Sequence, residues 1–184
     1  MMRIIIIIGF FLFPLSMTFC VSYDEALGMF NGGQYSEART AFQNYFVSNK
    51  NGEKTQPARF YAIKCLYKLK KYDDFTSEMA KLQIDSPNHP GLDDLAYLQA
   101  FSEDEQGHFD VSRSLFQEFL KNFPASPYYK NAQYYALKAL YRLGRYNEFN
   151  QGVERLRATD PSHKSLDDLD LLKAQILVNS GQFT

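Results

Sequence analysis

The sequence predicts an all-α protein, a solenoid of stacked helix-turn-helix repeats with a period of 37 residues. Two observations carry this prediction, because one set of aromatic residues and one set of prolines keep the same interval. The aromatic residues are Tyr35, Tyr72, Phe109, Tyr146 and Phe183, and the prolines are Pro87, Pro124 and Pro161. Internal periods of about 20 to 50 residues are typical of stacked arrays in which each unit contacts its neighbours.

Each periodic aromatic begins a segment with the spacing of one helical face. Apolar residues recur three, seven and ten positions further on, and this spacing indicates a single stripe of an α-helix. The stripe contains Ala38, Phe42, Tyr45, Phe75, Met79, Leu82, Phe116, Phe119, Phe149, Val153 and Leu156. Ser112 is its one interruption, and a proline ends the segment in three of the repeats.

A second helix is predicted before each aromatic. The stretch YYKNAQYYALKALYRL, residues 128–143, is rich in Ala, Leu and Tyr, and Gly144 follows it directly. Glycine permits the tight turn that folds one helix back on another. Gly33, Gly107 and Gly181 occupy the same place in other repeats, whereas Lys70 stands there once. Each unit is therefore expected to be an αα-hairpin.

The N-terminus has the plan of an export signal. Arg3 precedes an apolar run from Ile4 to Leu15, and small and polar residues follow it. We expect residues 1–22 to be a signal peptide, cleaved after Cys20 or Ser22, and residues 23–184 to be the solenoid. A retained anchor and a lipid on Cys20 are the alternatives. The expected location is periplasmic or secreted, with membrane contact only through such an anchor or lipid.

Composition argues against several classes of function. The formal net charge of −1 provides no basic field for nucleic acid. Cys65 lies among apolar residues and is interpreted as a small core residue. His89 and His163 each precede two aspartates, which favours the first turn of a helix over a metal site. No arrangement of nucleophile, base and acid is present, so we expect neither catalysis nor a cofactor.

The order of these signals resembles the tetratricopeptide repeat (TPR). The match rests on Gly33-Gln34-Tyr35 with Ala38 and Phe42, and on Leu143-Gly144-Arg145-Tyr146 with Pro161. The resemblance implies a right-handed α-solenoid over residues 23–184, with about four and a half repeats and an incomplete C-terminal end. The period departs from the roughly 34 residues of the family. Phe75 and Phe149 replace its small residue, so their hairpins should pack more widely.

A longer period of 74 residues lies beneath the first. ARFYAIKCLYKL, from residue 58, matches AQYYALKALYRL, from residue 132, and HPGLDDLAYLQA matches HKSLDDLDLLKA. Odd and even repeats are therefore of different types. Such paired repeats resemble the periplasmic TPR proteins of outer-membrane assembly and those associated with the Tol-Pal system.

The TPR resemblance also implies a concave groove, lined by the first helix of each hairpin, that holds a peptide or a partner helix. The expected groove residues form three sets, one from each of three repeats. They are Phe60, Lys64, Tyr67 and Lys68; then Tyr97, Phe101, Asp104 and Glu105; then Tyr134, Lys138, Tyr141 and Arg142. Tyr67 and Tyr141 have a second interpretation, as packing residues between repeats.

The leading functional hypothesis is an exported, non-catalytic scaffold for protein–protein contacts in the cell envelope, including outer-membrane biogenesis. The alternative is the helical substrate-binding part of a larger envelope enzyme whose catalytic domain lies beyond residue 184. Self-association through the open C-terminal end is a third hypothesis, because the last helix, expected over residues 166–181, lacks a polar outer face.

Overall fold

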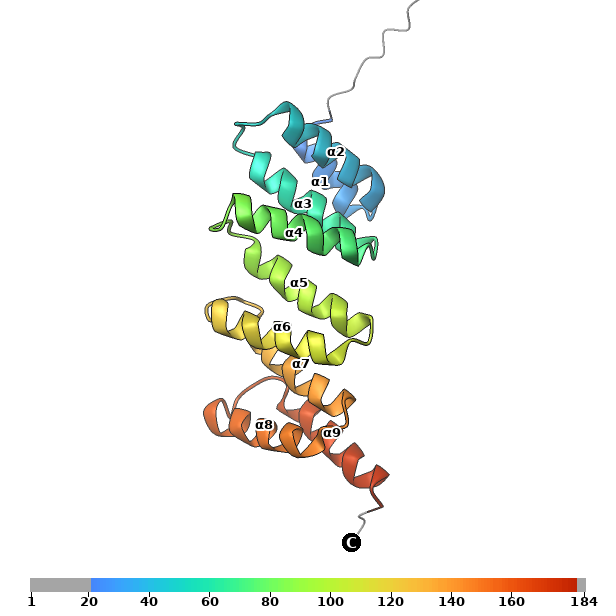
Figure 1. Cartoon of the computed structure of the whole chain (residues 1–184), viewed down its shortest axis with the longest axis vertical. Helices are drawn as coiled ribbons and strands as arrows, with labels where there is room; N and C mark the ends of the chain where they lie inside the picture. Colours follow the sequence, from blue (N-terminus) through green and yellow to red (C-terminus); the bar gives the residue numbers. More distant parts are fainter. Residues whose placement is uncertain (1–20, 182–184) are drawn as a thin grey trace, which may run out of the picture.

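The computed structural model describes residues 21–181, and in this part of the chain every regular element is an α-helix. The helices stack one after another along the long axis of the molecule (Figure 1). They are α1 (Tyr23–Asn31), α2 (Tyr35–Ser48), α3 (Thr55–Lys68), α4 (Tyr72–Asp85), α5 (Leu92–Glu105), α6 (Phe109–Asn122), α7 (Tyr129–Arg142), α8 (Tyr146–Thr159) and α9 (Leu166–Asn179). This arrangement confirms the predicted α-solenoid.

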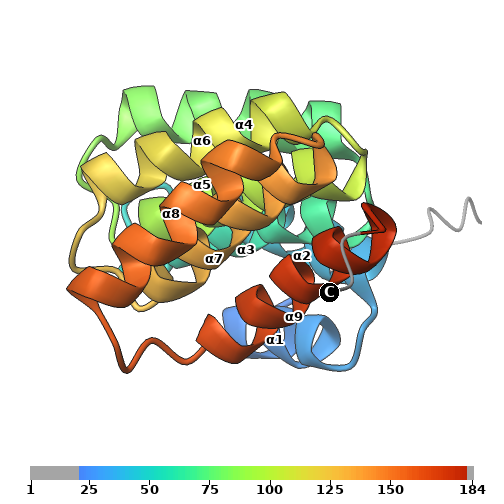
Figure 2. The ribbon, with the colours of Figure 1, turned by 90° about the horizontal axis from the view of Figure 1, so that it is seen from below.

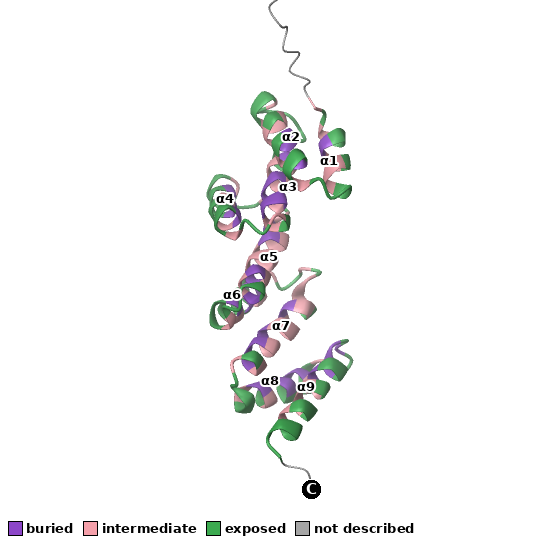
Figure 3. Cartoon of the chain, turned by 90° about the vertical axis from the view of Figure 1, so that its right-hand side faces the viewer, coloured by how far each residue is buried: buried purple, intermediate pink, exposed green. Residues whose placement is uncertain are grey.

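The 37-residue interval sets the helix boundaries. The even-numbered helices begin at the periodic aromatics, and α3, α5, α7 and α9 begin at residues 55, 92, 129 and 166. Seen along the stack, α4, α6 and α8 form an outer layer and α3, α5 and α7 an inner one (Figure 2). From the side, α4 and α6 lie apart from the line of α3, α5 and α7 (Figure 3).

The turn within each hairpin uses a left-handed residue. Gly33, Gly107, Gly144 and Gly181 have φ between 68° and 82°, and Lys70 has φ 57° at the same position. In the fourth hairpin the N–H of Gly144 donates to Tyr141 O and the N–H of Arg145 donates to Leu140 O. This pair of bonds is the Schellman motif, which satisfies carbonyls that a helix end leaves free.

Two kinds of hairpin alternate along the stack. Ala38 and Ser112 are fully buried at the fourth position of α2 and α6, where Phe75 and Phe149 stand in α4 and α8. The backbones of α1 and α2, and of α5 and α6, approach each other more closely than those of α3 and α4 or α7 and α8. The predicted wider packing of the phenylalanine hairpins is confirmed, because a ring holds two helices further apart than a methyl or hydroxyl group.

The core repeats the same alternation. The buried clusters around α2 and α6 are rich in alanine, whereas those around α4 and α8 are built mainly from large aliphatic residues. The helices α2 and α6 also pack closely on the helix that follows them, while α4 and α8 approach the next helix less closely. The chain thus contains two close-packed groups, α1–α3 and α5–α7, and α4 connects them.

The first helix has its own start signal. The Ser22 hydroxyl accepts a hydrogen bond from the N–H of Glu25, and the Glu25 carboxylate accepts one from the N–H of Ser22. This reciprocal pair is a capping box. Residues 1–20 of the expected signal peptide, and Phe183 of the fifth repeat, lie outside the described residues. Within residues 21–181, no helix has the length and apolar character needed to cross a membrane.

The left-handed turn predicts a stabilising substitution. Lys70→Gly should raise the free energy of unfolding by about 1 kcal/mol, because a left-handed φ costs a residue with a Cβ about that much. The change corresponds to a midpoint of thermal unfolding about 3 °C higher. Gly144→Ala is the matched control and should shift the midpoint in the opposite direction. Equal effects of the two substitutions, measured by circular dichroism, would contradict this account of the turn.

Candidate protein-interaction surface

Among the expected groove residues of α3, Lys64 contacts α5 and Phe60 contacts the loop before α5. The Lys64 ammonium group lies 5.1 Å from the centre of the Phe60 ring and 2.6 Å from Asp94 Oδ2. Both charged side chains are less than one-fifth exposed. Phe60 stacks on His89 and fills the space beside Gly91, where a Cβ would come within 2.4 Å of its ring. Lys64 therefore joins two repeats.

Tyr67 and Tyr141 pack against the second helix of their own hairpins. Tyr67 lies 5.8 Å from Phe75 between ring centres, and Tyr141 lies 5.8 Å from Phe149. Both tyrosines are half-buried. The Tyr67 hydroxyl also donates to Glu105, and burial together with this carboxylate raises the pKa of Tyr67 well above its ordinary value. This geometry supports the packing interpretation of the two tyrosines.

Tyr97 and Phe101 are half-buried between α5, α6 and α7. Tyr97 stacks on Tyr128 at 4.8 Å, and Phe101 meets Tyr135 edge-to-face at 5.0 Å. Burial raises the pKa of Tyr97 well above its ordinary value. Both rings hold neighbouring repeats together, so only part of each surface is open to a partner.

Asp104 is the most deeply buried of the expected groove residues. Its side chain is 5% exposed and receives Arg142 of α7 at 2.7 Å, while its Oδ1 atom has no hydrogen-bond partner among the described residues. The Arg142 guanidinium also lies over Phe109. A buried ion pair is costly to break, because removing one charge leaves the other unsatisfied. The expected acidic and basic stripes thus pair with each other across α5 and α7.

Tyr134, Lys138, Lys68 and Glu105 form the more open part of the predicted groove. Lys68 and Glu105 are exposed at the ends of their helices. The Lys138 ammonium group lies over two rings, 5.5 Å from Tyr134 and 5.6 Å from Tyr135, and no carboxylate lies within 4.0 Å of it in the described part of the chain. Its counterpart Lys64 is bound by Asp94, whereas Lys138, like the exposed Lys68, remains available to a partner.

The sequence analysis missed two aromatic anchors. Tyr61 stacks on Phe42 at 5.4 Å with an interplanar angle of 18°, and Tyr135 stacks on Phe116 at 5.6 Å with an angle of 16°. The two tyrosines are 74 residues apart, and each inserts into the preceding close-packed hairpin. The matching stretches RFYA and QYYA contained this signal. Each has two adjacent aromatic residues, and the second one, Tyr61 or Tyr135, packs into the preceding hairpin.

His89 lies in the loop before α5, and His163 lies in the loop before α9. Each histidine links its loop to the start of an earlier helix, which is α3 for His89 and α7 for His163. The N–H of Gly91 donates to His89 Nδ1, and the N–H of Ser165 donates to His163 Nδ1. The other ring nitrogen of His163 donates to Lys130 O at 3.1 Å. The described residues contain no group of three His, Cys, Asp or Glu side chains that could hold a metal ion. The histidines therefore act as clamps between repeats.

Cys65 is a core residue, as predicted. It is fully buried beside Ala58 and Ala62, and burial raises the pKa of its thiol to about 12. The thiolate is the nucleophilic form of cysteine, so this side chain is unreactive at neutral pH.

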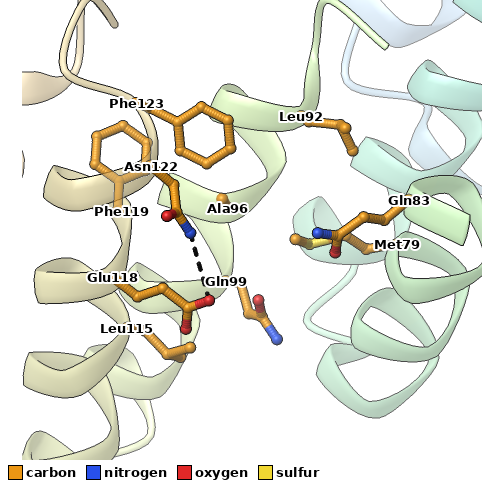
Figure 4. A pocket seen from close by; sticks show the side chains of 10 residues that line it. All are labelled: Met79, Gln83, Leu92, Ala96, Gln99, Leu115, Glu118, Phe119, Asn122 and Phe123. Atoms are coloured by element: carbon orange, nitrogen blue, oxygen red, sulfur yellow. Dashed lines mark hydrogen bonds between the residues drawn. The ribbon is translucent and has the colours of Figure 1, made fainter. Parts of the chain in front are cut away.

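Crevices also open on the outer side, between successive even-numbered helices. One of about 80 Å³ lies between α4 and α6 above α5, with Met79, Ala96 and Leu115 among its lining residues (Figure 4). A second, of about 270 Å³, occupies the same place between α6 and α8. There Gly152 stands where α6 has Leu115, and Leu137 closes over the glycine.

Comparison with known proteins gives the class of fold. Residues 94–126 match the tetratricopeptide repeat family. Two crystal structures of nearly identical TPR-like repeats from a kinesin light chain of Podosopora anserina are similar to the chain. The first, a point variant, has a TM-score of 0.63 at 12% identity, and the second has 0.62 at 13%. Each alignment covers 87% of this chain and 85% of the other. No curated protein matches the sequence.

The chain is thus a TPR-like solenoid. At such identities the likeness to the solved structures shows the fold alone. Repeats of this kind generally serve as non-catalytic scaffolds that bind other proteins, and no positive sign of an enzyme activity accompanies the fold.

Loss of an aromatic anchor should be costly. Tyr135→Ala is expected to lower the free energy of unfolding by about 3 kcal/mol, since it empties the space beside Phe116 and removes a stacked pair. Tyr129→Ala, on the same helix and outside these clusters, should cost less than about 1 kcal/mol. Denaturant unfolding of both variants tests the difference, and equal losses would show that Tyr135 is no anchor.

Stability should depend on pH through His89. Burial is the main cause that lowers the pKa of its imidazole, the positive charge of Arg59 lowers it further, and a hydrogen bond to the backbone of Gln56 opposes both. In the unfolded state, the His89 imidazole therefore binds a proton more readily, with the ordinary histidine pKa of about 6.5. The contribution of neutral His89 to the free energy of unfolding is complete above that pH. It is lost as the pH falls through the lower pKa that His89 has in the folded state.

The free energy of unfolding should accordingly fall more steeply between pH 7.5 and pH 5.5 in the parent protein than in a His89→Gln variant. Urea titrations at each pH measure this difference. If the free energy of unfolding falls equally steeply with pH in the two proteins, His89 does not contribute to the pH dependence.

Proposed function

We propose that the chain is an exported scaffold that holds a protein partner on the inner face of its solenoid. The observation that carries this proposal is the open aromatic and basic surface around Lys138 on α7. Tyr134 offers a half-buried ring, and the Lys138 ammonium group lies beside it without a carboxylate of its own. Aromatic platforms next to a charge are typical of sites that grip an extended segment or a helix.

The kind of partner follows from this chemistry. A cation over two aromatic rings is already partly stabilised, and a carboxylate from outside can complete its pairing. The partner segment is therefore expected to present an acidic side chain beside an apolar one. The ion pair Lys64–Asp94 joins α3 to α5, and the ion pair Arg142–Asp104 joins α5 to α7.

Photo-crosslinking in cells tests the position. A photoreactive amino acid at position 138 should give a discrete adduct, whereas the same amino acid at position 121 should not, because Lys121 is exposed on the outer helix α6. Mass spectrometry of the band identifies the partner. Lys138→Glu should weaken recovery of that partner at least tenfold, and Lys121→Glu should leave it unchanged. Adducts of equal yield from both positions would refute the inner-face site.

The cell envelope is the proposed location. Export is supported by the arginine and apolar run near the N-terminus, and the paired 37-residue repeats resemble those of periplasmic TPR proteins. The capping box favours cleavage after Cys20, since cleavage after Ser22 would remove the residue that caps α1. A role in outer-membrane or envelope biogenesis is part of this proposal.

Processing can be measured directly. The intact mass of the exported protein should correspond to a chain that begins at Val21. A mass that includes residues 1–20, or a lipid on Cys20, would indicate that the exported scaffold remains anchored to a membrane. A mass that begins at Tyr23 would contradict the role of Ser22 as the cap.

A further inference from the structure

The crevice between α6 and α8 is the widest of the three that lie between successive even-numbered helices in the described residues. Its volume is about 270 Å³, whereas the crevice between α4 and α6 has about 80 Å³ and that between α2 and α4 about 20 Å³. Helix α7 forms its floor, and Leu120, Leu137 and Leu156 make it apolar. Because the crevices along the stack are so much narrower, this space is a separate pocket and not part of a continuous groove.

The 74-residue period explains why this crevice is wide. Most of its lining residues have a counterpart 74 residues earlier, in the crevice between α2 and α4. Leu120 stands where the narrow crevice has Phe46, and Gln133 stands where it has Arg59. Gly152 takes the place of a glutamate. Smaller side chains at three equivalent positions therefore leave the wide crevice unfilled.

The narrow crevice between α2 and α4 has balanced charges around it. Arg59 of α3 pairs with Asp85 of α4 at 2.7 Å, and Lys81 pairs with Glu78 at 2.8 Å within α4. Each cation at this place in the stack thus has a carboxylate from the same hairpin.

Both of these carboxylates are missing from the wide crevice. Gly152 stands where α4 has Glu78, and Thr159 stands where it has Asp85. Arg155 occupies the place of the lysine, and no carboxylate lies within 4.0 Å of its guanidinium group in the described part of the chain. That group lies 4.0 Å from the point where a Cβ of Gly152 would stand. The wide crevice therefore has one cation at its rim and no acid to pair with it.

The rest of the rim is polar but uncharged. Gln117 of α6 and Gln133 of α7 contribute amide groups, and no aspartate or glutamate is among the described lining residues. The neighbouring Glu154 is held by Lys173 of α9. An apolar space with one unpaired guanidinium group at its edge is complementary to a molecule that is apolar at one end and anionic at the other.

We propose that the crevice between α6 and α8 binds a medium-chain fatty acid. The carboxylate pairs with Arg155 in place of the acidic side chain that α8 lacks, and the tail lies along Leu120, Leu137 and Leu156. Guanidinium groups match carboxylates in a bidentate geometry. The volume is close to the lower end of the range for small-molecule pockets, about 300 Å³. A single tail suits a pocket that does not continue along the stack. This site shares no residue with the inner-face site.

Calorimetric titration tests the ligand class. Sodium decanoate, kept below the concentration at which it forms micelles, should bind the purified protein saturably at one site. Decylamine has the same tail and a positive charge at neutral pH, so it should bind at least tenfold more weakly beside Arg155.

Variants of the cation locate the carboxylate. Arg155→Gln should weaken decanoate binding at least tenfold, whereas Arg155→Lys should retain most of the affinity because it keeps the charge. Lys81→Gln is the matched control, since it removes the corresponding cation of α4, and it should leave the affinity unchanged. Both parent side chains are exposed, so the fold should be retained in all three variants.

A double variant supplies the missing acid from within the chain. Gly152→Glu with Leu137→Ile reproduces the pair Glu78 and Ile63 of the earlier hairpin. The second change is needed because a Cβ at position 152 would come within 2.3 Å of the Leu137 side chain. This variant should lose decanoate binding while its circular dichroism spectrum stays that of the parent protein.

Four results would overturn the proposal. The first is an absence of saturable decanoate binding, and the second is equal affinity for decanoate and decylamine. The third is an equal effect of Arg155→Gln and Lys81→Gln. The fourth is tighter binding of a short peptide that ends in leucine with a free carboxylate, which would assign the crevice to the C-terminus of a protein.

Discussion

The separation of the two helices in a hairpin is the constraint on which the rest of this structure depends. It is set by one residue, the fourth of the second helix, which is small in α2 and α6 and phenylalanine in α4 and α8. Small residues let the backbones approach, and rings keep them apart. Because the choice alternates, the chain forms two close-packed groups of three helices. The 37-residue repeat thus sets the spacing of helices along the chain, and the 74-residue pair sets the alternation of close and wide hairpins.

This packing decides which surfaces remain for a partner. Tyr61 and Tyr135 reach back into the close-packed groups, and the ion pair of Asp104 with Arg142 lies within the second group. The pair of Lys64 with Asp94 spans α4 and connects the two groups. Most charges of the inner face are therefore used for assembly, and the exceptions are Lys68 and Lys138, which lie over tyrosine rings. A scaffold built in this way presents a partner with few free charges at fixed spacing.

The sequence predicted the helix boundaries well because they follow from local rules. An aromatic, a turn residue and a proline in one register determine where a helix begins and ends, and Lys70 adopts the left-handed turn although it is not glycine. The surface was harder to predict. Whether Lys64 faces a partner or Asp94 depends on contacts between residues 30 positions apart, which periodicity does not report. The two histidines were correctly placed before helices, but their bonds to earlier repeats required the fold.

Hydrogen–deuterium exchange tests the alternation of close and wide hairpins most directly. If the two close-packed groups are the stable units, amides of α2 should exchange more slowly than those of α4, although α4 lies nearer the middle of the stack. The same order should hold for α6 and α8. In a uniform array that frays from its ends, protection rises smoothly towards the centre. Slower exchange in α4 than in α2 would contradict the account.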